Sequence, residues 1–277
     1  PNSASRQGFS AKDVIYLITP DRYANGNPNN DSNPKMKEES NRKNKDGRHG
    51  GDLQGIMENL DYIEAMGFTQ LWLNPLLEND QSRLSYHGYS TTDYYNIDAR
   101  YGSNDLYKEL SRRAKDKNIG LIKDIILNHI GSEHWWMKDL PSEDWINNKG
   151  KFKPTSHVHE VVHDPYATQT EKNAYTDGWF VRTMPDLNQQ NSFLATYLIQ
   201  CSIWWIEFAD LSGLRVDTYS YADKEFLSLW SGRISAEYPD FNFVGEEWPG
   251  VPNIPATAYW QAGSKTYDDY KSSTPSM

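Results

Sequence analysis

Gly213-Leu214-Arg215-Val216-Asp217 and Phe243-Val244-Gly245-Glu246 are short apolar runs that each end in a carboxylate. Between them, residues 226–234 place apolar side chains at helical spacing, which predicts a strand–helix–strand unit. A helical crossover of this kind joins parallel strands. Asp217 and Glu246 are therefore expected at the same end of two neighbouring strands.

The same alternation extends towards the N-terminus. Residues 14–18 form a continuous apolar run, typical of a strand buried on both faces, and residues 71–73 and 121–127 are strand-like. Helical spacing marks residues 53–66 and 103–114 between these runs. The pattern predicts an α/β fold, either a doubly wound sheet or part of a (β/α)8 barrel. No Gly-rich phosphate fingerprint follows the first strand, which counts against a dinucleotide fold.

Residues 130–186 interrupt this rhythm. They are polar and aromatic, and the segment is too long for an ordinary connection between a strand and a helix. We expect a small inserted domain here. The predicted organisation is a first part of the barrel at 1–129, an inserted domain at 130–186, and a continuation of the barrel at 187–277.

Composition excludes several classes of protein. The chain has 277 residues, with 38 Asp and Glu against 28 Lys and Arg, a formal net charge of −10. This balance argues against nucleic acid or an anionic membrane as the main partner. No run of about 18 apolar residues is present, so no membrane span is expected. The single cysteine, Cys201, falls on an apolar helical face and leaves the redox compartment open. A secreted, periplasmic or cell-surface location is favoured over a cytoplasmic one.

The two carboxylates suit glycosidic bond chemistry, which needs a pair of acids. Arg215 and Asp217 are two apart on a strand and share a face, so the guanidinium is expected to keep Asp217 ionised, as a nucleophile requires. Glu246 and Glu247 face opposite ways, so only one enters a barrel mouth. Burial beside Trp248 is expected to favour the protonated form of Glu246, which is the form that a general acid needs. Taken singly, each pattern is also typical of a structural ion pair or a solvated strand end.

Together the motifs resemble the α-amylase family of glycoside hydrolases, and they follow that family's order along the chain. They are Tyr86-His87-Gly88-Tyr89 with Asp93-Tyr94-Tyr95, Asp124-Ile125-Ile126-Leu127-Asn128-His129, Met184-Pro185-Asp186-Leu187-Asn188, Gly213 to Asp217, and Gly245-Glu246 with Trp248. Gly178-Trp179-Phe180 favours the neopullulanase and cyclomaltodextrinase branch.

This resemblance implies a (β/α)8 TIM barrel, here with strands one to five, and a domain inserted after strand three. It implies retaining hydrolysis of α-glucosidic bonds in starch-derived glucans, namely maltooligosaccharides, cyclodextrins or pullulan. Asp217 is implied as the nucleophile and Glu246 as the acid/base, with carboxyls ~5–5.5 Å apart. The side chains implied to hold the sugar are Arg215, His129, Tyr89 and His87.

The loop at residues 21–52 crowds oxygen donors at short spacing, which suits Ca²⁺. Asn, Asp and Gly also form turns, and the residues alone favour a plain turn-rich loop. Resemblance to the calcium loop of the neopullulanase branch implies a structural Ca²⁺ site instead. The implied ligands are Asn25, Asn27, Asn30, Asp31, Gly50 and Asp52, with Asn27 standing where that branch often has Asp.

The chain ends at Met277, soon after the fifth predicted strand. Strands six to eight and the family's third carboxylate are expected beyond it, so residues 1–277 alone are expected to be inactive. Two alternatives stay open. A transglycosylase or isomerase of the same family would share these motifs, and a non-catalytic glucan-binding module would keep only the fold. The oligomeric state is not predicted.

Overall fold

The computed structural model describes residues 5–162 and 164–247. Its main sheet has five strands that are parallel throughout and adjacent in chain order, β1-β2-β5-β6-β7. Their bounds are β1 Ile15–Ile18, β2 Gln70–Leu73, β5 Gly120–Ile126, β6 Gly213–Asp217 and β7 Asn242–Gly245. A doubly wound sheet reverses its strand order, whereas a barrel adds each strand beside the last. The order therefore supports part of a (β/α)8 barrel.

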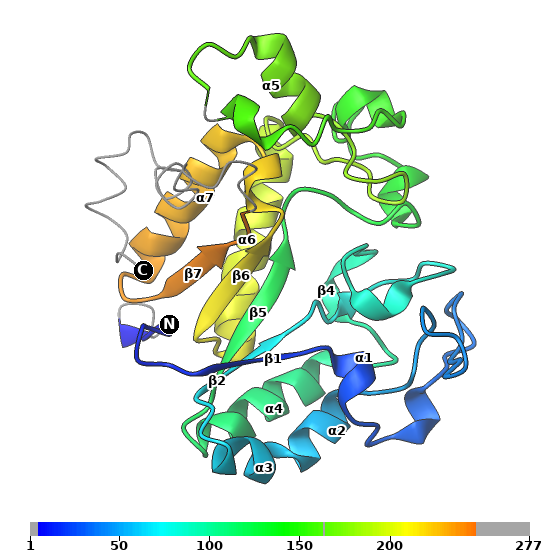
Figure 1. The fold of residues 1–277 in the computed structure, drawn as a ribbon, viewed down its shortest axis with the longest axis vertical. Coiled ribbons are helices and arrows are strands. Elements are labelled where there is room, and N and C mark those ends of the chain that lie inside the picture. Colours follow the sequence, from blue (N-terminus) through cyan, green and yellow to red (C-terminus); the bar gives the residue numbers. More distant parts are fainter. Residues whose placement is uncertain (1–4, 163, 248–277) are drawn as a thin grey trace.

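Helices follow the strands and flank the sheet (Figure 1). Their bounds are α1 Pro20–Tyr23, α2 Leu53–Glu58, α3 Leu60–Ala65, α4 Asn104–Lys115, α5 Gln169–Thr176, α6 Ser192–Ala209 and α7 Lys224–Glu237. Ser103 caps α4 as its position predicts, because its side chain accepts from the Leu106 N–H at 3.1 Å. Cys201 on α6 is buried, as expected. Within the described ranges, no helix combines the length and apolarity needed to cross a bilayer.

The helical pattern at residues 53–66 gives two helices rather than one. Asn59 separates α2 from α3 with φ −105° and ψ 10°, outside the helical range, and its side chain donates to the Gly55 carbonyl at 2.7 Å. Short polar side chains compete with the helix for backbone hydrogen bonds in this way. Ile56 and Ile63 are buried as the spacing predicts, whereas Met66 lies exposed.

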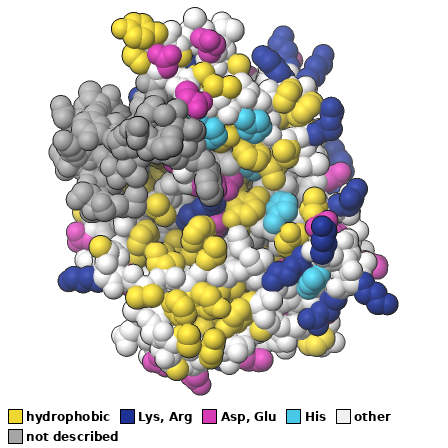
Figure 2. Space-filling model, viewed as in Figure 1, with side chains coloured by type: hydrophobic (Ala, Val, Ile, Leu, Met, Phe, Trp, Pro, Cys, Tyr) yellow, Lys and Arg dark blue, Asp and Glu magenta, His cyan; other side chains and the backbone are white. Residues whose placement is uncertain are grey.

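The prediction that residues 14–18 are buried on both faces is wrong for this structure. Ile18 is 2% exposed, but Ile15 is 41% and Leu17 is 48% exposed. β1 is an edge of the described sheet, and its Ile15–Leu17 face is the face that a closed barrel would cover. Figure 2 shows apolar side chains gathered on the visible side in the region of β1.

Two further features were not foreseen in detail. A small antiparallel pair, β3 (Leu77–Glu78) with β4 (Asp93–Ile97), follows β2. β3 has two residues and an irregular register, so it leaves no periodic signal. Residues 130–186 hold α5 and short 3₁₀ turns, and they lie beyond the ends of β5 and β6 (Figure 1). Their status as a separate domain stays a prediction.

Lys123 on β5 is a buried cation on the helix-covered face of the sheet. It is 2% exposed, and its Nζ lies 4.1 Å from the ring centre of Trp205 on α6 and 5.1 Å from that of Tyr107 on α4. In the described ranges this Nζ has no hydrogen-bond partner. Burial lowers the pKa of Lys123 to about 7, although Cys201 and Asp124 act in the opposite direction.

Replacing Lys123 by Met is expected to stabilise the fold by about 1–4 kcal/mol at pH 7, because burying a charge without a polar partner is costly. The unfolded Lys keeps its proton to about pH 10.4, whereas the folded one releases it near pH 7. The cost is therefore full below pH 7 and falls as the pH rises to 10.4, so the gain should shrink at pH 10. Urea denaturation at both pH values tests this, with the exposed Lys108→Met on α4 as the matched control. A destabilised K123M protein would contradict the expectation.

Candidate active site

Asp217 and Glu246 lie side by side at the carboxyl ends of β6 and β7. Val216 pairs with Gly245 across the two strands, and the Glu246 N–H donates to the Val216 carbonyl at 2.9 Å. Asp217 is the last residue of β6 and Glu246 directly follows β7. The strand–helix–strand pattern thus brings the two carboxylates to one edge of the sheet, at the end where barrel active sites lie.

Arg215 joins these two carboxylates. Its Nη1 is 2.8 Å from Oδ1 of Asp217, and its Nη2 is 2.9 Å from Oε1 of Glu246. A single planar guanidinium therefore holds both acids, which is compatible with the ~5–5.5 Å carboxyl separation of retaining glycosidases. Figure 2 shows basic, acidic and histidine side chains together among apolar ones near the middle of the visible face.

A third carboxyl, Asp124 on β5, belongs to the same cluster. It is 1% exposed, and Arg215 Nη1 lies 3.0 and 3.2 Å from its two oxygens. Trp72 Nε1 donates to Oδ2 at 3.0 Å, and the Tyr89 hydroxyl donates to the same oxygen at 3.2 Å. Three carboxyls thus share one guanidinium in a buried site. The sequence places Asp124 in a motif without assigning it this contact.

Arg215 lowers the pKa of Asp217 as expected, but two other effects act in the opposite direction. Burial, and next the charge of Asp124, raise the pKa of Asp217 to about 8, although Arg215 opposes them. Burial likewise raises the pKa of Asp124 to about 6 against the pull of Arg215. One positive charge cannot offset the three negative charges of two buried carboxyls and the partly exposed Glu246, so the cluster favours retaining a proton.

His129 and Tyr89, the two residues that the resemblance implies hold the sugar, lie beside the carboxylates. His129 Nε2 lies 4.0 Å from Asp217 Oδ2 and 3.0 Å from the Tyr89 carbonyl. Burial lowers the pKa of His129 to about 4, so the ring is neutral and donates from Nε2 to that carbonyl. The Tyr89 hydroxyl accepts from Asn74 at 2.7 Å and donates to Asp124, which fixes the ring over the site.

His87 contacts Tyr89 through a hydrogen bond and through its ring. Its Nδ1 accepts from the Tyr89 N–H at 2.9 Å, and the two rings stack with centres 5.8 Å apart. Burial lowers the pKa of His87 to about 4, so Nδ1 stays an acceptor at neutral pH. The structure therefore gives His87 a contact that orients Tyr89.

Glu247 points away from Glu246 towards another partner. Its Oε1 lies 3.7 Å from Nδ1 of His159, whereas Glu246 contacts Arg215. This difference agrees with the expected alternation of adjacent side chains along a strand. Trp248, expected to shield Glu246, lies outside the described residues.

Thr218 is a site residue that the sequence did not predict. It has φ 45° and ψ 44°, a left-handed conformation that is unusual for a β-branched residue and costs about 1–3 kcal/mol. Its N–H donates to Glu246 Oε2 at 2.9 Å, and its Oγ1 donates to Asp217 Oδ2 at 3.3 Å. No sequence pattern signals a strained threonine, so only its place after Asp217 could have drawn notice.

The loop at residues 21–52 leaves oxygen donors available. Asn25 Oδ1 and Asn30 Oδ1 are buried with no hydrogen-bond partner among the described residues. Asn25 Nδ2 donates to Asp31 Oδ1 at 2.7 Å. The Asp31 carboxylate lies against Gly50, where a Cβ would come within 2.7 Å of it and where φ is 87°. Asn25, Asn30 and Asp31 therefore fit a hard cation.

The remaining two expected ligands have structural contacts. Asp52 accepts from the N–H groups of Gly26, Asn27 and Gly55 at 2.7–3.1 Å, and so caps α2 and holds the loop. Asn27 Oδ1 accepts from the Asn29 N–H at 3.2 Å. In the described ranges no group of three His, Cys, Asp or Glu side chains suits a metal, so a cation here would rely on amide oxygens beside the Asp31 carboxylate.

Asn128 and Asp186 present a second pair of unsatisfied oxygens. Oδ1 of each is buried with no hydrogen-bond partner in the part of the chain that the structure describes. Asn147 donates to the other Asp186 oxygen at 2.8 Å, and burial raises the pKa of Asp186 well above its usual value. The sequence placed both residues in motifs but predicted no ligand for them. Water or a hard cation would satisfy these oxygens.

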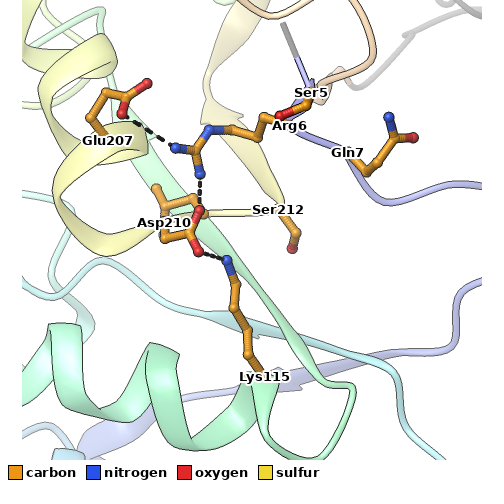
Figure 3. Close-up of a pocket in the computed structure, with 8 residues that line it drawn as sticks. Ser5, Arg6, Gln7, Lys115, Glu207, Asp210 and Ser212 are labelled. Atoms are coloured by element: carbon orange, nitrogen blue, oxygen red, sulfur yellow. Dashed lines mark hydrogen bonds and ion pairs between the residues drawn. The ribbon is translucent and has the colours of Figure 1, made fainter. Parts of the chain in front are cut away.

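A separate cavity opens at the other end of β6, next to Ser212. Arg6 pairs with Asp210 and, at 3.4 Å, with Glu207, while Lys115 pairs with Asp210 (Figure 3). These four charged side chains are paired with one another.

Comparison with known proteins places these observations in a family context. The family profile described as "Alpha amylase, catalytic domain" matches residues 17–266. The chain is 34% identical to a beta/alpha-amylase of Paenibacillus polymyxa over 78% of this chain and 17% of the relative. It is 32% identical to a cyclomaltodextrinase of Geobacillus thermopakistaniensis over 86% of this chain and 39% of the relative.

A solved structure agrees with this relationship. The crystal structure of an Anoxybacillus alpha-amylase matches with a TM-score of 0.76 and 32% identity, over 90% of this chain and half of that one. The chain spans less than half the length of the two curated relatives.

Proposed function

This chain belongs to the alpha-amylase family, and we propose that it carries the reacting groups of a retaining glycoside hydrolase for α-glucosidic bonds. The observation that carries this proposal is the guanidinium of Arg215, which contacts the carboxylates of both Asp217 and Glu246. Relatives named cyclomaltodextrinase, maltogenic amylase and neopullulanase favour starch-derived substrates: maltooligosaccharides, cyclodextrins or pullulan.

In the first step, an oxygen of Asp217 attacks the anomeric carbon and forms a glycosyl ester as the bond to the leaving oxygen breaks. Glu246 gives its proton to that oxygen, and the leaving sugar departs with a free hydroxyl. The reaction therefore needs Asp217 ionised and Glu246 protonated. Burial and the charge of Asp124 raise the pKa of Asp217, whereas the reaction needs the proton on Glu246.

In the second step, Glu246 takes a proton from water and the oxygen of that water attacks the anomeric carbon. The ester to Asp217 breaks, the carboxylate returns, and the sugar leaves with its original anomeric configuration. Arg215 stays beside both acids through the cycle and offsets the negative charge that alternates between them. His129 and Tyr89 lie where they can bind sugar hydroxyls.

The test is the anomeric form of the first product. The intact protein should be incubated with soluble starch, a cyclodextrin and pullulan, and each reaction followed by proton NMR before mutarotation. We expect the α-anomer first. An initial β-anomer would show inversion and exclude Asp217 as a nucleophile, and products longer than the substrate would favour transglycosylation. Absence of turnover on all three would contradict the proposal.

We also propose that Ca²⁺ binds the loop at residues 21–52 through the oxygens of Asn25, Asn30 and Asp31. The support is the pair of buried amide oxygens that have no hydrogen-bond partner within residues 5–162 and 164–247, and the close approach of Asp31 to Gly50. The ion would stabilise the folded conformation of the loop. Asp52 would support the site through the backbone N–H groups that it binds.

Removing Ca²⁺ is expected to lower the melting temperature of the intact protein, because an ion bound only by the folded state stabilises it. At a hundredfold excess over Kd the loss is about 2.7 kcal/mol. Differential scanning fluorimetry with EGTA and with added Ca²⁺ measures it. Asn30→Ala should abolish the Ca²⁺ response, whereas Asn29→Ala, an exposed neighbour, should keep it. Equal melting temperatures with and without EGTA would refute the site.

A further inference from the structure

Ion pairs and hydrogen bonds join Asp217, Glu246, Arg215 and Thr218 in a closed ring. Arg215 holds Oδ1 of Asp217 at 2.8 Å and Oε1 of Glu246 at 2.9 Å. Thr218 holds the other oxygen of each acid, Oδ2 of Asp217 through its hydroxyl at 3.3 Å and Oε2 of Glu246 through its N–H at 2.9 Å. Each carboxylate is thus fixed at both of its oxygens.

We propose that Thr218 is a positioning residue that sets the separation and orientation of Asp217 and Glu246. The inference rests on the proposed function, because it assigns Thr218 a part in the same two-carboxylate reaction. A salt bridge to one guanidinium alone leaves each carboxylate able to rotate about its last bond. A second donor on the opposite oxygen removes that freedom, which is what attack along one line requires.

The backbone at Thr218 provides this arrangement. β6 ends at Asp217, and Thr218 turns the chain into a 3₁₀ turn, Tyr219–Tyr221, in a left-handed conformation with φ 45°. The turn directs the Thr218 N–H to the Glu246 side chain, while the next N–H, of Tyr219, donates to the Glu246 carbonyl at 3.2 Å. A glycine would adopt this φ without strain, so the β-branched side chain is not there for the turn itself.

The hydroxyl has an electrostatic consequence as well. A donor to Oδ2 favours the ionised form of Asp217, the form that attacks. It acts with Arg215 against burial and against the charge of Asp124, both of which favour the protonated form. Thr218 therefore supports both the geometry and the charge of the nucleophile.

The experiment compares Thr218→Val, which keeps the shape and removes the hydroxyl, with Thr218→Ser, which keeps the hydroxyl. It uses the intact protein and whichever of soluble starch, a cyclodextrin and pullulan is turned over fastest. We expect T218V to lower kcat about 10- to 100-fold with little change in KM, because the lost bond is to a charged group that reacts. T218S is expected to recover kcat to within about threefold of the original protein.

The pH profile separates positioning from packing. Without the hydroxyl the pKa of Asp217 rises, so the acidic limb of kcat/KM in T218V should move to higher pH, and T218S should return it. Thr218→Ala replaces T218V if the latter does not fold, as judged by its melting temperature. A T218V or T218A protein with unchanged kcat and acidic limb would overturn the proposal. So would T218S being as impaired as T218V, since that would indicate packing.

Failure of this inference can be told apart from failure of the proposed function. Asp217→Asn is assayed beside the Thr218 variants. If Asp217→Asn is inactive and T218V matches the original protein, only the role of Thr218 is wrong. If Asp217→Asn is fully active, the two-carboxylate mechanism fails, and the role of Thr218 fails with it.

Discussion

Replacing Asp217 by Asn is expected to lower kcat by on the order of 10⁴-fold or more, because the amide cannot form the glycosyl ester. The side chain keeps its shape, and Arg215 still contacts Asp124 and Glu246, so the site should hold together. Release of reducing sugar from starch, a cyclodextrin and pullulan measures the loss in the intact protein. The same change at Asp116, an exposed carboxylate at the end of α4, is the matched control and should leave kcat unchanged.

Stability provides a second readout for Asp217→Asn. The folded pKa of Asp217, near 8, is above the unfolded value of about 3.9. Ionised Asp217 therefore costs stability increasingly as the pH rises from 4 to 8, and the cost is full above pH 8. The variant lacks this charge, so its melting temperature should exceed that of the original protein, by more at pH 8 than at pH 5. A variant that is inactive and also less stable at pH 8 would show misfolding and leave the catalytic role without support.

Local sequence patterns predicted the elements that are buried on one side and regularly spaced. Five parallel strands appear within a few residues of the apolar runs, and Ser103 caps α4 as its position indicates. The structural features that the sequence did not predict depend on single residues or on parts of the chain that are distant in sequence. Asn59 divides a helix through a local side-chain bond, and Leu17 is exposed because its partner surface depends on how far the sheet closes.

The candidate site shows the same limit. The positions of Asp217 and Glu246 follow from the register of β6 and β7. This register is predictable because side chains alternate between the two faces of a strand. The protonation of Asp217 could not be predicted in this way. It depends on burial and on the charge of Asp124, which lies 93 positions away in the chain. The conformation of Thr218 is also invisible in the sequence, since threonine ordinarily avoids positive φ.

Replacing Arg215 by Met is the other change with a large expected effect. Arg215 is 6% exposed and faces the carboxyls of Asp124, Asp217 and Glu246. Removing one partner of a buried ionic cluster leaves uncompensated charge and typically costs about 3–5 kcal/mol. We expect a loss of this size in urea denaturation at pH 8, together with a large loss of activity. Arg113→Met, at a half-exposed arginine of α4, is the matched control and should change stability by less than about 1 kcal/mol.

The pH dependence identifies the cause of that loss. Arg215 is the largest of the effects that oppose burial at Asp124 and Asp217, so without it their folded pKa values, already near 6 and 8, should rise further. Carboxyls with raised folded pKa values destabilise the fold as the pH climbs from about 4 towards those values, because the unfolded state is then the more readily ionised one. The deficit of Arg215→Met should therefore be smaller at pH 5 than at pH 8. Arg215→Lys restores a charge that cannot bind two carboxylates in one plane, so it should recover part of the stability and little of the activity. A deficit that is the same at both pH values would mean that Arg215 stabilises the fold by packing, and the shared-charge account of Asp217 and Glu246 would then fail.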